Sequence, residues 1–255
     1  PSGEANPRGK AALMKALEID DSLAEAHASL ASIMFWYEWD WAGAERGFKR
    51  AIELNPNYAR AHHWYADILM TLGRFDEALR EIHEARQLAP LSPIVAMTAA
   101  ELFHFSRQYD RAIEEYGKAL QVDPDFALTH LWLGSAYLEK GMADAAITEI
   151  KRSIALSGND SFYVAALGRA YAVTGRKDEA RQVLRDLEGR SKRTFVSPVG
   201  VALIHAALSQ KDEAFEWLEK AFEERTEWMV YLKIDPPFDP LRPEPRFKDL
   251  VRRVG

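Results

Sequence analysis

Alanine recurs along this chain at a constant interval of 34 residues. It occupies the same register at Ala44, Ala78, Ala112, Ala146, Ala180 and Ala214. Aspartate follows the same interval, at Asp76, Asp110, Asp144, Asp178 and Asp212. A fixed period of this length indicates one supersecondary unit repeated along the chain, and each unit buries its apolar face against its neighbours. The sequence therefore predicts a stacked array rather than a single globular core.

Each unit has the pattern of two amphipathic helices, with apolar residues three and four positions apart. The stretch LGRFDEAL, residues 72–79, shows how the two helices join. Gly73 suits a left-handed turn after the first helix, Asp76 is expected to cap the second, and Ala78 lets the helices approach closely. Proline cannot extend a helix, and it follows the second helix of three units, at Pro56, Pro90 and Pro124.

The period and these columns resemble the tetratricopeptide repeat family from about residue 8 to residue 225. The resemblance implies an all-α fold, a right-handed α-α superhelix of about six helix pairs whose first helices line the concave side. Residues 1–22 are expected to be the second helix of a truncated leading repeat. Residues 23–225 are expected to form the array, and residues 226–255 a C-terminal capping helix with a Pro-rich tail.

The end of the array also resembles repeat arrays that are fused to bacterial regulators, including winged-helix activators, protein kinases and nucleotide cyclases. This resemblance implies that the chain is the C-terminal part of a larger bacterial regulatory protein. The implied role is a non-catalytic scaffold for protein–protein interaction. Two alternatives stay open, namely a self-association module and an accessory domain that presents substrate to a fused enzyme.

Composition excludes several other classes of protein. The net charge of −6 argues against the basic face that nucleic-acid binding requires. The chain has no cysteine, which excludes disulfides and thiolate metal sites. No apolar run approaches the roughly 20 residues that span a bilayer. We therefore expect no nucleic-acid partner and no membrane insertion, and we expect the cytoplasm as compartment, with the periplasm equally compatible with the cysteine count.

Motifs for catalysis are missing from the sequence. It contains no phosphate-binding loop, no dinucleotide GxGxxG, no GxSxG elbow and no HExxH. Histidine recurs at one repeat position, at His27, His62 and His130. Equivalent residues on successive packed helices stand about 8 to 10 Å apart, which is too far to share one zinc ion. We expect no catalytic residue, no metal and no cofactor.

A candidate binding surface follows from the helical register. Residues three and four apart share one face of a helix, so a stripe runs along the first helix of each repeat. We predict that this stripe lines a groove for a partner. Its candidate residues are Trp36, His63, Asp67, Met70, Met97, Glu101, His104, Phe105, Leu131, Leu138, Phe162 and Arg169. Apolar residues bordered by Asp67 and Glu101 predict an apolar protein or peptide partner that carries Lys or Arg.

The stretch FWYEWDW, residues 35–41, lengthens the first turn by one residue. Trp41 takes the column of Phe75 and is expected to pack under the second helix. Trp39 replaces the turn glycine. Trp36 and Trp39 are therefore candidate contacts for a partner or for a second copy of the chain.

Overall fold

The computed structural model describes residues 2–255, and the side chains of residues 7–255. This range is all-helical and contains no strand. Its α-helices are α1 Ser2–Ile19, α2 Ala24–Ile33, α3 Trp41–Leu54, α4 Ala59–Thr71, α5 Phe75–Leu88, α6 Pro93–Phe105, α7 Tyr109–Val122, α8 Ala127–Glu139, α9 Ala143–Leu156, α10 Ser161–Val173, α11 Lys177–Ser191, α12 Pro198–Ala207, α13 Lys211–Glu223 and α14 Pro245–Val254. Shorter helical turns are η1 Met34–Glu38, η2 Glu227–Tyr231 and η3 Pro236–Phe238.

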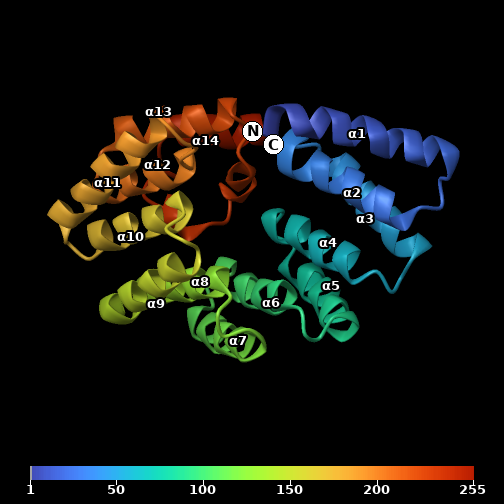
Figure 1. The fold of residues 1–255 in the computed structure, drawn as a ribbon, viewed down its shortest axis with the longest axis horizontal. Helices are drawn as coiled ribbons and strands as arrows, with labels where there is room; N and C mark the ends of the chain where they lie inside the picture. The colour runs from blue at the N-terminus through green and yellow to red at the C-terminus, as the bar shows by residue number, and fades with distance from the viewer. Residues whose placement is uncertain (1) are drawn as a thin grey trace.

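Successive helices pack as six pairs, from α2 with α3 to α12 with α13. This confirms the predicted solenoid. Figure 1 shows that the pairs follow one another around a nearly closed ring, with α14 and the C-terminus returning beside α1 and the first pair. None of the helices within residues 2–255 combines the length and the apolar composition that a bilayer crossing requires.

The alanine column explains the close packing within each pair. All six alanines of the column have an exposed fraction of 0%, from Ala44 to Ala214. Each lies near the start of the second helix, where a larger side chain would separate it from the first. Alanine therefore recurs at this position because it sets the distance between paired helices.

The turns within the pairs use a left-handed residue, as the glycine pattern predicts. Gly73 has φ of 74°. Three turns place another residue in this conformation, with φ of 59° at Trp39, 63° at Arg107 and 65° at Ser209. A left-handed residue ends the first helix and redirects the chain into the second. Trp39 thus takes the conformational role of the missing glycine.

The expected cap at Asp76 is wrong by two positions. Helix α5 begins at Phe75 and Arg74 is the residue before it, without a side-chain cap. Asp76 lies inside the first turn, where its charge favours the positive end of the helix dipole. A side-chain cap does occur in the first repeat, where Asp40 accepts a hydrogen bond from the Gly43 N–H at 2.9 Å. Asp40 takes the position that Arg74 has in the next repeat, directly before the second helix, where its carboxylate can cap that helix.

The last thirty residues pack in two different places. Helix α14 packs on α13, held by ion pairs that include Arg253 with Glu219 at 2.9 Å and Lys211 with Glu244 at 2.6 Å. The preceding turns η2 and η3 instead enter the inside of the ring (Figure 1). The C-terminal segment, which is our name for residues 227–241, therefore lies against the concave side of the array.

Candidate interaction surface on the concave side

The residues of the predicted stripe lie along the concave side, but most of them are not exposed. Nine of its twelve residues are buried, and Trp36, Phe162 and Arg169 are half-buried. The buried members are His63, Asp67, Met70, Met97, Glu101, His104, Phe105, Leu131 and Leu138. The expectation of an open apolar groove along the whole stripe is therefore corrected.

Two aromatic residues of the C-terminal segment cover much of the stripe. The ring of Tyr231 stacks on Phe105 with centroids 5.3 Å apart, and it lies 5.8 Å from the ring of Trp36. The ring of Trp228 stacks on Phe162 at 4.6 Å and lies 5.9 Å from Trp132. The segment thus occupies the position in which the sequence predicts an external partner.

Other stripe residues belong to the packing between repeats. His104 has no exposed surface, and its ring is surrounded by the rings of Phe105, Tyr109, Tyr116 and Trp132. Burial lowers the pKa of His104 to about 3, so the imidazole is neutral at physiological pH. His104 is a core residue and not a surface contact.

The two acids of the predicted groove are also buried. Burial raises the pKa of Asp67 well above its ordinary value, and the nearby Glu101 carboxyl adds to this effect. Burial raises the pKa of Glu101 to about 8. Glu101 is therefore mainly protonated at neutral pH, and burial disfavours the charge of Asp67. Because both carboxyls are also buried, they do not form the exposed acidic border that the sequence pattern indicates.

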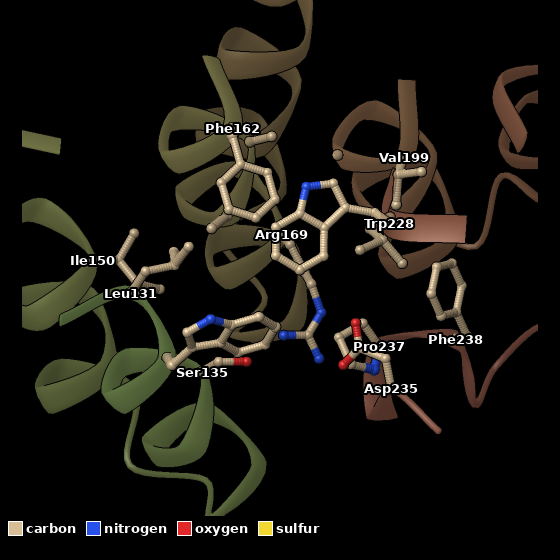
Figure 2. Close-up of a pocket in the computed structure, with 15 residues that line it drawn as sticks. Leu131, Ser135, Ile150, Phe162, Arg169, Val199, Trp228, Asp235, Pro237 and Phe238 are labelled. Atoms are coloured by element: carbon tan, nitrogen blue, oxygen red, sulfur yellow. The ribbon is translucent and has the colours of Figure 1, made fainter. Parts of the chain in front are cut away.

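A pocket remains open where the C-terminal segment passes α8, α10 and α12. Its free volume is about 70 Å³. Figure 2 shows apolar walls from Leu131, Phe162 and Trp228, with Arg169 and Asp235 facing one another at its floor. Arg169 donates a hydrogen bond to Glu139 at 2.5 Å, and Oδ1 of Asp235 is buried without a hydrogen-bond partner among the described residues.

Sequence reasoning found Phe162, Arg169 and Leu131 but missed the residues that complete the pocket. Trp228 and Asp235 lie in the tail WMVYLKID, which leaves the 34-residue register. The signal available was the two aromatic residues and the aspartate of this stretch, in a tail expected only to cap the array. Among the described side chains, no three His, Asp or Glu residues are grouped so that they could hold a metal ion.

The stretch FWYEWDW forms the seam that closes the ring. The ring of Trp39 lies 5.1 Å from Phe222 of α13, and the Arg225 guanidinium lies over it at 4.7 Å. Trp41 donates its indole N–H to the backbone oxygen of Val254 at 2.9 Å. Trp36 contacts Tyr231 of the C-terminal segment. The tryptophans predicted as partner contacts are thus engaged within the chain.

We expect Trp39→Asn to destabilise the fold by about 3 kcal/mol, in the range found when a large buried aromatic ring is removed. Asparagine tolerates the left-handed backbone, so the substitution tests the loss of the ring rather than strain. Ser209→Asn is the matched control, because Ser209 holds the same backbone conformation in an exposed turn. Urea denaturation measures both variants, and equal midpoints would show that the seam contributes nothing to stability.

The architecture defines a class of protein, an α-solenoid of repeated helix pairs whose first repeat contacts its last repeat and α14. The chain belongs to the tetratricopeptide repeat family. Models of that family described as tetratricopeptide repeat match residues 35–102, 127–160 and 163–186, and a model described as TPR repeat matches residues 106–141. Membership in this family supports the role of a scaffold for protein–protein interaction.

Comparison with individual proteins supports the same fold. The type IV pilus assembly protein PilF of Pseudomonas aeruginosa is 36% identical over 80 residues, which is 31% of this chain and 31% of that protein. The crystal structure of the APC/C hetero-tetramer Cut9–Hcn1 matches 99% of this chain and 46% of its own chain, with a TM-score of 0.69 and 16% identity. The TPR protein TTC0263 of Thermus thermophilus matches 77% of this chain and 99% of its own, with a TM-score of 0.62 and 21% identity.

Proposed function

We propose that this chain is a non-catalytic protein-interaction module of a larger bacterial regulator, and that its partner binds on the concave side at the pocket beside the C-terminal segment. One observation carries the proposed binding position. The pocket leaves half-buried aromatic rings, Phe162 and Trp228, next to a buried carboxyl that lacks a hydrogen-bond partner within the described part of the chain. Apolar rings beside a polar group with unused bonding capacity are typical of a recognition site.

The partner that suits this surface is an apolar segment carrying Lys or Arg. The similarity to PilF covers only a third of each chain, so it supports the repeat fold and a scaffold role, and pilus assembly is not part of the proposal.

Tetratricopeptide scaffolds are generally non-catalytic. Turnover on a panel of hydrolase and transferase substrates, or stoichiometric zinc in the purified protein, would contradict the non-catalytic assignment.

Blocking the pocket tests the binding position. Ser135 lies on α8 in the pocket wall, and Ser135→Arg would fill the space with a long cationic side chain. We expect this variant to lose at least ten-fold in capture of the partner that the unmodified chain enriches from its native lysate. Thr148→Arg on the exposed surface of α9 adds the same charge and should retain capture. Equal capture by both variants, measured by quantitative mass spectrometry, would move the binding site away from the pocket.

The proposal that this chain is a module of a larger regulator is tested by reading the gene upstream of it. A DNA-binding, kinase or cyclase domain encoded upstream is the expected finding. An upstream glycosyltransferase domain would instead favour the alternative in which the array presents substrate to an enzyme.

A further inference from the structure

The pocket is built from both the repeat array and the C-terminal segment. Leu131, Phe162 and Leu203 come from three first helices of the repeats, and Trp228 and Phe238 come from the segment. One water needs about 10 to 15 Å³ of such volume, so about 70 Å³ holds roughly five waters or a short unbranched alkyl chain. An apolar chain would displace water from apolar walls, which is favourable.

Asp235 is held in place by its backbone rather than by its side chain. Its N–H donates to the Tyr231 oxygen at 2.9 Å, and its own carbonyl oxygen accepts from Phe238 N–H at 3.2 Å and from Arg242 at 3.0 Å. Its exposed fraction is 7%, yet Oδ1 has no hydrogen-bond partner in the range that the structure describes. A buried carboxyl oxygen without a partner is unfavourable, and a ligand that donates to it would remove that penalty.

The cations around the pocket are engaged with carboxylates other than Asp235. Arg169 is paired with Glu139, as described above. Arg242 donates to Asp239 at 2.7 Å, and Asp239 also pairs with Arg107 at 2.7 Å. Arg169 faces Asp235, but no cation of the described chain hydrogen-bonds its Oδ1, so a donor placed in the pocket would supply the missing partner.

We infer that this pocket is a binding site for a lysine side chain of a partner protein, with the ammonium group on Asp235 and the four-carbon stem against the aromatic walls. Lysine combines an apolar stem with a cationic end, so it can satisfy both parts of the pocket. The rings of Trp132 and Trp228 add a favourable electrostatic surface for a cation. The inference deepens the proposed function, on which it rests, by naming the anchor that the partner supplies.

The titration of Asp235 gives the site a pH dependence. Burial raises the pKa of Asp235 to about 7, while the positive charges of Arg169 and Arg242 oppose that rise and the charges of Glu139 and Asp239 add to it. Glu101 also lies within electrostatic range and is mainly protonated at neutral pH. Because a cation favours the ionised form of Asp235, binding should release a proton and should strengthen as pH rises from 6 to 8.

The test uses n-butylammonium, which is the lysine side chain without its backbone, on the full chain. Isothermal titration calorimetry should detect n-butylammonium binding, at least ten-fold weaker binding of the neutral n-butanol, and no binding of butyrate. Asp235→Asn should weaken butylammonium at least ten-fold and abolish the pH dependence. Butyrate binding more tightly than butylammonium would overturn the inference, because Arg169 would then be the anchor. Absence of binding by every probe would also overturn the inference.

Arg169→Gln distinguishes a cation site at Asp235 from an anion site at Arg169. This test does not depend on the folding of the Asp235 variant. Removal of this cation should strengthen butylammonium binding, whereas an anion site would lose butyrate binding. Nα-acetyl-lysine amide should bind at least as tightly as butylammonium. Its rejection would contradict a peptide as the source of the ammonium group. Because these probes do not involve the natural partner, their failure would leave the capture experiment with Ser135→Arg as an independent test of the proposed function.

Discussion

Removal of residues 226–255 is expected to abolish the stable fold of the array at physiological temperature. The deleted residues include ten apolar side chains that are buried, namely Met229, Val230, Tyr231, Leu232, Ile234, Phe238, Leu241, Phe247, Leu250 and Val254. Burying each such side chain contributes about 1.5 to 3 kcal/mol, before the conformational entropy of ordering the segment is subtracted. The deletion also exposes the stripe on the array, so we expect aggregation and binding of a hydrophobic dye.

A point variant measures how much one side chain contributes to this stability without removing the backbone. Tyr231→Ala should lower the free energy of unfolding by about 3 to 5 kcal/mol, because the ring is buried against Phe105 and Trp36. Phe195→Ala is the control, since Phe195 is 72% exposed and its loss should change stability by less than about 0.5 kcal/mol. Circular dichroism melts measure all three proteins. An unchanged melting temperature after the deletion would mean that residues 226–255 do not stabilise the array.

Stability is expected to fall as pH rises from 6.5 to 8. The carboxyls of Asp67, Glu101 and Asp235 have raised pKa values in the folded chain, because burial disfavours the ionised form. The folded state therefore holds protons that the unfolded state has released above pH 4.5. The stabilisation is fully present below the unfolded pKa values, and it is lost as pH rises through the folded ones, about 8 for Glu101.

Buried histidines act in the opposite direction at lower pH. Burial lowers the pKa of His63 to about 4 and that of His104 to about 3. The unfolded state therefore binds more protons than the folded state below pH 6.5, and acid destabilises the chain through these two groups. Above pH 6.5 this opposing effect ends. The hydrogen bond to Glu81 raises the pKa of His62, so His62 adds to the fall in stability as pH rises through its folded pKa. The steepest fall is therefore expected above pH 6.5.

Glu101→Gln isolates the contribution of the Glu101 carboxyl to the pH dependence of stability. The stability of the variant relative to the unmodified chain should rise by about 1.4 kcal/mol per pH unit between pH 5 and pH 8, since one titrating proton has been removed. Urea denaturation at four pH values measures this difference, in which the contributions of the histidines cancel. Glu114→Gln, an exposed site on α7, should give a difference independent of pH. A flat difference for Glu101 would mean that its carboxyl is ionised in the folded chain.

The repeat architecture was predictable because its determinants are local. The alanine column, the left-handed turn residues and the spacing of apolar positions each act within 34 residues, so the number and pairing of helices follow from periodicity. The concave surface was not predictable in the same way. Its exposure depends on Trp228 and Tyr231, which contact residues 66 to 195 positions away and lie outside the repeat register. No local pattern indicates where such a tail will lie.

The contacts at the seam alter how the array should fold and unfold. An open repeat array is stabilised by nearest neighbours, so its ends can unravel one repeat at a time. Here the bond from Trp41 to Val254 joins residues 213 positions apart, and the bond from Arg225 to Tyr37 joins residues 188 apart. Closing such long loops has an entropic cost that grows slowly with length and slows folding. Because the seam ties the first repeat to the last, the ring should unfold as one cooperative unit, with a single transition in place of the stepwise melting of an open solenoid.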